Sequence, residues 1–254
     1  GMATPSAVIV DAVRTPLGKG KPGGAYAGIH AVDLHAASLR ALVERTCIDP
    51  AVVDDVISGA VGQVGEQSGN TARWAVLAAG FPESVPAVTI DRQCGSSQQA
   101  LHFAAQGIMA GAYDVAIASG VESMSRIPIG SQAQGADVAG PSVRERYAPG
   151  LVPQGVSAEL IAARWGFSRA QLDDFAATSH QRAAAAWKDG LFDDEVVPVS
   201  IPQRRGEPVL FAEDEGIRGD TTAESLSRLR PAFRPNGTIT AGNASTINDG
   251  AAAV

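Results

Sequence analysis

The sequence predicts an α/β fold, in which a mostly parallel sheet carries helices on both faces. Within residues 1–121, short apolar runs alternate with amphipathic stretches of helical length. This alternation is typical of parallel strands joined by right-handed helical crossovers. Hydrophobic residues make up 45% of the 254 residues but aromatic residues only 5%, so small aliphatic side chains dominate, as closely packed α/β layers require.

Each predicted strand is a short apolar run next to a turn signal. The first, "SAVIVDAV", lies between Pro5 and the turn Arg14-Thr15-Pro16, and we expect it to be buried. Helices are expected where apolar residues recur at helical spacing, or where a small-residue stretch ends at a glycine such as Gly80. The expected strands are 6–13, 52–61, 85–90 and 113–121, and the expected helices are 31–47, 69–80 and 94–111.

The pattern changes after residue 121. Residues 122–153 are rich in Gly, Pro, Ser and Gln and are expected to form a loop or excursion. Two helices are expected in 154–188, separated by Gly166; Ser168 can cap the second and Gly190 can terminate it.

The remaining segments alternate between polar and apolar character. Residues 196–240 mix short extended pieces with charged turns, and 238–254 become small and apolar again. The sequence stops on "AAAV" as though a strand had just begun. We therefore expect this chain to be a fragment of a longer one.

Composition excludes several functional classes. The net charge is −7 and the basic residues are scattered, which argues against nucleic acid as the main partner. Two cysteines cannot form a disulfide framework and lack the spacing of a metal site, so no metal is expected. No apolar run is long enough to span a membrane, and the first residues lack a signal-peptide pattern. A cytoplasmic location is the expectation.

Gly18, Gly20 and Gly23 fit the dinucleotide-binding pattern G-x-G-x-x-G. That site needs a helix to begin on the glycines, so that its N-terminus faces the pyrophosphate. Pro22 and Gly24 interrupt the pattern, and no helical stretch starts before residue 31. We interpret the motif as a flexible loop and expect no cofactor.

Cys94, in "DRQCGSSQ", is the strongest candidate nucleophile. It follows a predicted buried strand and stands where the next helix begins. The unpaired N–H groups and the positive end of the helix dipole favour a thiolate there, and Gly95 and Ser96 leave room for a carbonyl to approach. The Cys94 N–H itself could act as an oxyanion donor. The alternative is a small buried cysteine with a packing role, which is how we interpret Cys47.

A nucleophilic cysteine normally needs a base, and the four histidines are the first candidates. His35 and His180 lie in amphipathic helices and are expected at the surface or an interface. His102 follows Cys94 by more than two helical turns, about 12 Å along the axis, which is too far for a hydrogen bond. His30 lies in a loop. The sequence therefore identifies no base for Cys94.

Several blocks resemble the thiolase family, which includes acetyl-CoA acetyltransferases and 3-ketoacyl-CoA thiolases. The block "DRQCGSSQQALHFAAQGIMAGAYDVAIASGVESMSR" is similar to the family's nucleophile segment, and "VDAVRTPLGK" to its opening strand and turn. The blocks "SHQRAAAAWKDGLFDDEVVPV" and "LRPAFRPNGTITAGNASTINDGAAAV" resemble later segments. The resemblance runs through essentially the whole chain.

The resemblance implies a layered thiolase fold with a mixed, mostly parallel sheet. It implies an N-terminal domain of residues 1–121, completed by 246–254, and an inserted loop domain of 122–245 that covers coenzyme A. It also implies acyl transfer through an acyl-Cys94 intermediate: a 3-ketoacyl-CoA is cleaved to acetyl-CoA and a shortened acyl-CoA, or the reverse condensation occurs. Coenzyme A is then a substrate, not a cofactor, and a homo-oligomer, dimer or tetramer, is expected.

Matched positions imply the residues that bind coenzyme A. Arg218 would hold the phosphate end, and Ser245 would contact the pantetheine arm. From the sequence alone, a solvated surface arginine and a turn serine are the ordinary alternatives. Ala241 and Gly242 would let the arm lie close to the backbone. Gln154, in "VPQG", stands where relatives commonly have methionine, which leaves the acyl chain length open.

Two departures from the family pattern affect the expected activity. Many relatives read Cys-Gly-Ser-Gly, whereas Ser97 and then Gln98 stand here, and this polar pair could alter acyl preference. The second half of the family, with its Gly-His-Pro histidine and second active cysteine, has no counterpart in residues 1–254. We therefore expect the isolated chain to be inactive, although the full-length protein would be an enzyme.

Two other functions are compatible with the same residues. One is a condensing enzyme that acts on carrier-protein substrates, which would share the nucleophile but lack "AGNAS". The other is a half-fold that binds acyl-CoA or partner subunits without turnover.

Overall fold

A computed structural model describes residues 3–254, and its contacts divide the chain into two compact units. The first unit comprises residues 1–134, 193–215 and 247–254; the second comprises 135–192 and 216–246. Residues 193–215, expected in the loop domain, thus pack with the first unit. The domain boundaries of the whole protein stay a prediction.

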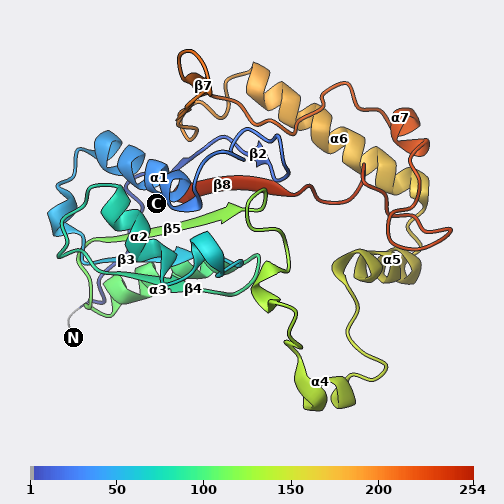
Figure 1. Cartoon of the computed structure of the whole chain (residues 1–254), viewed down its shortest axis with the longest axis horizontal. Coiled ribbons are helices and arrows are strands. Elements are labelled where there is room, and N and C mark those ends of the chain that lie inside the picture. The colour runs from blue at the N-terminus through green and yellow to red at the C-terminus, as the bar shows by residue number, and fades with distance from the viewer. Residues whose placement is uncertain (1–2) are drawn as a thin grey trace. The chain divides into compact units, whose positions relative to one another are not determined.

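The first unit is built on a six-stranded mixed sheet (Figure 1). Its main path runs β1-β8-β5-β3-β4, and β2 also pairs with β8. The central strand β3 pairs in parallel with β4 and β5, whereas β8 is antiparallel to β1, β2 and β5. The strands are β1 (Val13–Arg14), β2 (Gly18–Lys19), β3 (Asp55–Gly59), β4 (Ala87–Ile90), β5 (Ala116–Ser123) and β8 (Asn248–Ala253).

Helices cover both faces of this sheet, as the sequence predicts. Because side chains alternate along a strand, Val56 and Ile57 of β3 point to opposite faces. Val56 packs in a cluster with residues of α1 (Ala31–Thr46) and α2 (Thr71–Ala78). Ile57 packs with Ala100 and Ala104 of α3 (Ser96–Met109). The unit is therefore a three-layer α/β structure. Short 3₁₀ turns lie at Pro50–Val52, Gly65–Gln67 and Ser131–Ala133.

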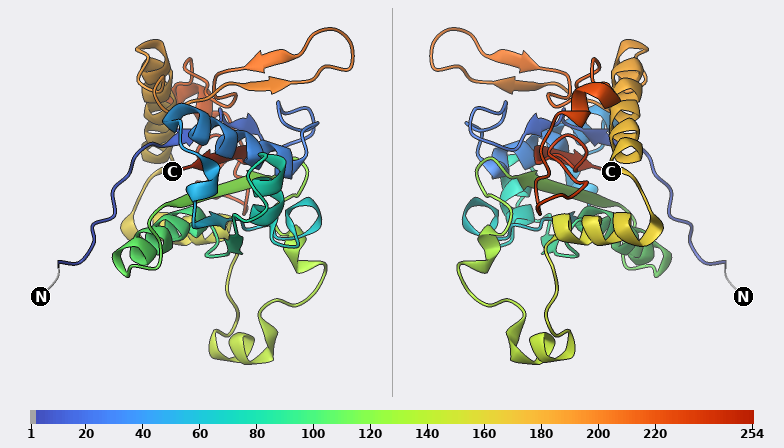
Figure 2. Two further views of the ribbon diagram at one scale, coloured as in Figure 1. Left: turned by 90° about the vertical axis from the view of Figure 1, so that its left-hand side faces the viewer. Right: turned by 90° about the vertical axis from the view of Figure 1, so that its right-hand side faces the viewer.

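A β-hairpin from the middle of the chain also belongs to this unit. Its strands, β6 (Val199–Ile201) and β7 (Val209–Phe211), pair antiparallel and stand out in Figure 2. Val199 packs with Tyr26 and Leu34, and the rings of Tyr26 and Phe211 meet edge to face at 5.1 Å. Aromatic contact thus fixes the hairpin on the first unit.

The strand predicted at 6–13 is wrong for most of its length. Only Val13 joins the sheet, and Val8, Ile9 and Val10 are 74%, 68% and 81% exposed. The register explains this difference, since Val13 lies opposite Ala253 of β8. Within the described residues, β1 and its pairing with β8 begin at Val13, so the apolar run before it lies outside the sheet.

The second unit is largely helical. It holds α4 (Gly140–Arg146), α5 (Gln154–Trp165), α6 (Arg169–Lys188) and α7 (Ala223–Ser227). The expected helix signals are confirmed: Gly166 ends α5 in a left-handed conformation, and Ser168 forms a capping box with Gln171 at the start of α6. The short helix α4 lies inside the segment expected to be a loop, where Pro141 stands in its first turn. Within the described part of the chain, every helix is too short or too polar to cross a membrane.

Candidate active site

Cys94 lies on a tight turn between β4 and α3, two residues before the helix begins. The turn is held by local hydrogen bonds: the Arg92 N–H donates to Oγ of Ser96, and this hydroxyl donates to the Gln93 carbonyl. Gln93 takes a left-handed backbone conformation with φ of 47°, which is uncommon for a residue with a side chain. The thiol of Cys94 is exposed at the end of this turn.

Two glycines allow the start of α3 to lie directly on the sheet. A β-carbon on Gly59 of β3 would lie 2.4 Å from the Ser97 nitrogen, and one on Gly120 of β5 would lie 1.7 Å from Oγ of Ser97. A side chain at Gly59 would meet the backbone of the helix start, and one at Gly120 would meet the side chain of Ser97. The helix start, and with it Cys94, is therefore positioned by strands β3 and β5.

Cys94 opens into a cavity of about 390 Å³ in the first unit. Two acidic residues line it that the sequence analysis missed, Glu122 and Asp249. Oε1 of Glu122 accepts hydrogen bonds from the N–H groups of Val61 and Gly62, so this carboxylate anchors the loop after β3. Each acid stands in a strand whose other residues are mostly small or apolar. An isolated acidic residue in such a strand is the sequence signal by which they could have been predicted.

Asp249 is fully buried beside this cavity. Burial raises its pKa, and hydrogen bonds from the Ser125 N–H and hydroxyl, at 2.9 and 2.5 Å, act in the opposite direction. The cavity is also lined by Arg14, which pairs with Glu195 and Asp214 at 2.7 and 2.8 Å. Burial alone would lower the pKa of Arg14, but these two carboxylates raise it.

None of the four histidines lines the Cys94 cavity in residues 3–254. His30 caps α1, and His102 lines a separate apolar cavity of about 560 Å³ in the first unit. The surface position expected for His35 is wrong: it is fully buried, with Nε2 2.9 Å from Oγ of Ser119, and burial lowers its pKa to about 4. The spacing of apolar residues in 31–47 did not show whether His35 lies on the buried or the exposed face of this helix.

The predicted coenzyme A residues all belong to the second unit, whereas Cys94 belongs to the first. Arg218, Ala241 and Gly242 line one cavity of about 420 Å³. Ser245 and Gln154 are exposed and do not line it. The sequence analysis missed five further lining residues, which are Asp220, Thr221, Ser225, Leu226 and Leu229.

Helix α6 holds the loop that carries Arg218. The Arg218 N–H donates to Nδ1 of His180 at 3.1 Å, and Nε2 of Gln181 donates to the Thr221 carbonyl at 2.9 Å. Burial, followed by the positive charge of Arg218, lowers the pKa of His180. By accepting this hydrogen bond, Nδ1 of His180 fixes the backbone of the arginine.

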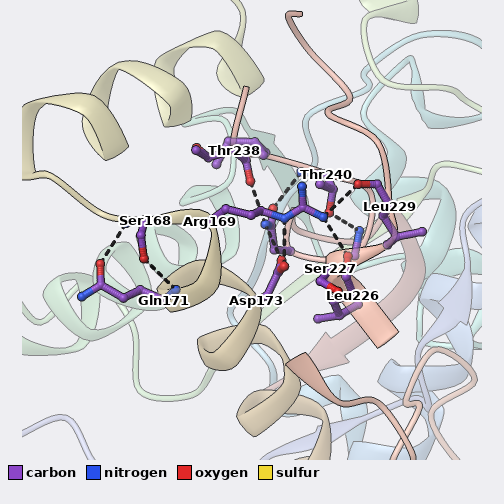
Figure 3. Close-up of polar contacts among 12 residues, drawn as sticks. Ser168, Arg169, Gln171, Asp173, Leu226, Ser227, Leu229, Thr238 and Thr240 are labelled. Carbon is purple, nitrogen blue, oxygen red and sulfur yellow. Dashed lines mark hydrogen bonds and ion pairs between the residues drawn. The ribbon is translucent and has the colours of Figure 1, made fainter. Parts of the chain in front are cut away.

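An ionic network that includes the buried Asp173 contacts two of the residues that line this cavity, Leu226 and Leu229, and Figure 3 shows its polar contacts. Arg169 and Asp173 of α6 form an ion pair at 2.8 Å, and Arg169 also binds the carbonyls of Leu226 and Leu229. No group of three or more His, Cys, Asp or Glu side chains in residues 3–254 is placed to hold a metal ion.

Comparison with known proteins is consistent across sequence and structure. The family model "Thiolase, N-terminal domain" matches residues 7–254. The chain is 46% identical over 262 residues to a steroid 3-ketoacyl-CoA thiolase of Mycobacterium tuberculosis, covering all of this chain and 62% of the relative. It is also 46% identical over 264 residues to a beta-ketoadipyl-CoA thiolase of Acinetobacter baylyi, covering 98% of this chain and 65% of the relative.

A solved structure confirms the fold. The crystal structure of an acetyl-CoA acetyltransferase of Bacillus anthracis matches with a TM-score of 0.86 and 39% identity, over 99% of this chain and 65% of that one. The chain thus spans somewhat less than two thirds of the length of the relatives it matches. On the family match and these likenesses, the chain belongs to the thiolase family.

Proposed function

We propose that Cys94 carries the acyl group in a thiolase reaction, so that the whole protein is an acyl-CoA C-acyltransferase. The observation that carries the proposal is the exposed Cys94 thiol on the turn before α3, open to a cavity large enough for an acyl group. The relatives include a steroid 3-ketoacyl-CoA thiolase and a beta-ketoadipyl-CoA thiolase, and their names support the reaction class.

The chemistry assigned to Cys94 is attack on the 3-keto carbonyl of a 3-ketoacyl-CoA. A bond forms between Sγ and C3, the C2–C3 bond breaks, and the released acetyl-CoA carbanion takes a proton. The thiol of a second coenzyme A then attacks the acyl-cysteine, which releases the shortened acyl-CoA and regenerates Cys94. The second step exchanges the acyl group between two sulfurs and so conserves the thioester bond, and the acyl-cysteine divides one difficult reaction into two easier steps.

The cavity lined by Arg218, Ala241 and Gly242 is the proposed site for coenzyme A. Arg218 supplies a positive charge for a phosphate, and the small residues leave space for the pantetheine arm. Ser245 and Gln154 stay in the proposal as contacts made outside this cavity. We also expect a homo-oligomer, dimer or tetramer, located in the cytoplasm.

We infer further that residues 1–254 alone do not turn over, because no histidine of the described residues lines the Cys94 cavity. Among the described residues this cavity holds the proposed acyl-accepting cysteine and the carboxylates of Glu122 and Asp249, but no histidine base that could take the thiol proton.

The test is thiolysis of acetoacetyl-CoA by the gene product read through to its stop codon. Cys94→Ser should abolish turnover, and Cys47→Ser, at the other exposed cysteine, should leave it unchanged. The 254-residue chain should show negligible turnover. Thiolysis that survives Cys94→Ser would overturn the assignment of the nucleophile, and robust turnover by the short chain would overturn the inference that it lacks a base.

A further inference from the structure

The two walls of the cavity in the second unit touch each other. Leu226 and Leu229, at the end of α7 and in the turn that follows, form one wall, and Ala241 and Gly242 belong to the other. A β-carbon on Gly242 would lie 2.5 Å from Cδ2 of Leu226 and 2.6 Å from Cδ1 of Leu229. Because the contact is this close, the relative position of the two walls decides the width of the cavity.

Arg169 holds the first wall. Its Nη2 donates to the carbonyl oxygens of Leu226 and Leu229 at 2.7 and 2.8 Å. Leu226 lies at the end of the short helix α7 and Leu229 just beyond it, and the Leu226 carbonyl also accepts from the Leu229 N–H. The planar guanidinium serves both carbonyls and one carboxylate together, which a lysine ammonium cannot match in geometry.

Asn243 holds the second wall. Its Oδ1 accepts from the Thr240 N–H at 2.8 Å, and its Nδ2 donates to the Thr238 carbonyl at 2.9 Å. The side chain thereby closes the turn that presents Ala241 and Gly242.

A single buried carboxylate joins the two walls. The side chain of Asp173 is 2% exposed; Oδ2 accepts from Nε of Arg169 at 2.8 Å, and Oδ1 accepts from Nδ2 of Asn243 at 3.0 Å. Figure 3 shows Asp173 and Arg169 between the carbonyls of one wall and the turn of the other. Removal of Arg169 would leave the buried charge of Asp173 without its cation, so the pair resists rearrangement.

We propose that Asp173 and Arg169 are positioning residues that set both walls of this cavity before coenzyme A binds. The inference rests on the proposed function, which assigns the cavity to coenzyme A. A preformed site loses less conformational entropy on binding, so disruption of the pair should weaken affinity without changing the chemistry at Cys94.

The test compares Asp173→Asn and Arg169→Lys with Arg228→Lys in the 254-residue chain. Arg228 is a matched control because it forms an exposed ion pair with Glu224 on α7, 74% and 82% exposed, and does not line the cavity. Calorimetry should show binding of coenzyme A weakened about tenfold or more in the first two variants. The control should bind as the unaltered chain does.

Two further readouts separate positioning from general damage to the fold. The acetyl-CoA concentration that half-saturates acylation of Cys94 should rise, while the maximal rate stays unchanged. Acylation by an N-acetylcysteamine thioester, which lacks the nucleotide, should not change at all. In the unaltered chain, hydrogen exchange at the amides of Thr240 and Leu229 should be slow before coenzyme A is added, which tests preformation even if the variants fail to fold.

The outcomes distinguish this inference from the proposed function. If Arg218→Ala weakens coenzyme A binding but Asp173→Asn and Arg169→Lys do not, the positioning role is overturned and the site stands. Fast hydrogen exchange at the amides of Thr240 and Leu229 in the chain without coenzyme A would likewise overturn the positioning role. If the unaltered chain does not bind coenzyme A, the site assignment itself fails.

Discussion

The hydroxyl of Ser97 occupies the space that a side chain on Gly120 would need. A β-carbon at Gly120 would lie 1.7 Å from Oγ of Ser97, far inside any normal contact. The start of the helix that follows Cys94 therefore packs against a glycine in a neighbouring strand, 26 positions from the cysteine in the chain.

Gly120→Ala should displace the first turn of α3. We expect acylation of Cys94 to slow by about tenfold or more, because a small misplacement of a nucleophile is costly. The free energy of unfolding should fall by about 1–3 kcal/mol through overpacking. Denaturant titration and the rate of Cys94 acylation measure these two effects.

A second substitution supplies the control. Ser97→Gly removes the hydroxyl that clashes, so the double variant Gly120→Ala/Ser97→Gly should recover most of the acylation rate. Gly59→Ala should not be rescued in this way, because its β-carbon would meet backbone atoms of Ser96 and Ser97. Equal rates for Gly120→Ala and the unaltered chain would contradict the account.

Binding of coenzyme A should weaken at acidic pH through His180. The fold lowers the pKa of His180, and Nδ1 accepts from the Arg218 N–H only when the ring is neutral. The neutral His180 ring therefore supports the Arg218 backbone fully above about pH 6.5, which is the pKa of histidine in the unfolded chain. This support is lost as pH falls through the lower pKa that His180 has in the folded chain. Calorimetry between about pH 7.5 and 5 should show this loss of affinity.

His180→Gln isolates the histidine from the ligand's own titration. A glutamine oxygen can accept the same hydrogen bond without titrating, so the variant should depend less on pH, and the phosphates of coenzyme A contribute equally to both. Identical pH profiles would show that His180 does not support Arg218.

Asp249→Asn should change how the free energy of unfolding depends on pH, with a gain in stability at higher pH. Because burial raises the pKa of Asp249, its contribution to stability is present below the unfolded pKa of about 3.9 and is lost as pH rises through the folded value. The variant avoids this loss and should gain stability relative to the unaltered chain as pH rises above about 4. Asp249→Ala leaves the Ser125 N–H without its partner and should cost about 1–3 kcal/mol. Urea denaturation at several pH values measures both variants, and an unchanged stability difference across pH would exclude this role.

Glu159→Gln should destabilise the second unit. Glu159 is 1% exposed and accepts from the N–H groups of Thr238 and Ile239, each at 2.7 Å. Burial alone would raise its pKa, but these hydrogen bonds lower it, with help from the charge of Arg234. The contribution of the Glu159 carboxylate to the free energy of unfolding is thus fully present above about pH 4.3, the pKa of glutamate in the unfolded chain. It is lost as pH falls through the lower pKa of Glu159 in the folded chain.

We expect Glu159→Gln to lower the free energy of unfolding by about 1–3 kcal/mol at pH 7, with a smaller difference below pH 4. Denaturation followed by tryptophan fluorescence measures it, since Trp165 and Trp187 both lie in this unit. Glu224→Gln, at an exposed carboxylate, is the control and should have little effect. A loss equally large in the control would contradict the role of the buried hydrogen bonds.

Signals within a few residues of each other were enough to predict α5 and α6. The pairing of strands that are far apart in the chain was harder to predict from the sequence. The capping box of Ser168 and Gln171 and the glycine at 166 are encoded within a few residues, so α5 and α6 were predicted from the sequence. The strand expected at 6–13 depends on a partner some 240 residues away, and the register with β8 leaves most of it unpaired. Apolar character predicted a strand but could not supply its neighbour.

The candidate sites show the same division. The position of Cys94 before a helix followed from the sequence, but the supporting glycines, Gly59 and Gly120, come from other strands. Arg218, Ala241 and Gly242 were joined by family resemblance and lie around one cavity. The role of Asp173 could not be predicted from the sequence. Its contacts with Arg169 and Asn243 form only when α6 packs against the turn at 238–243.

The most direct test of the central claim is mass spectrometry of the 254-residue chain after incubation with acetyl-CoA. We expect a mass increase of one acetyl group on the peptide that contains Cys94, absent in Cys94→Ala and retained in Cys47→Ala. An acetyl group that persists in Cys94→Ala, or that forms on Cys47 instead, would contradict the assignment of Cys94 as the acyl acceptor.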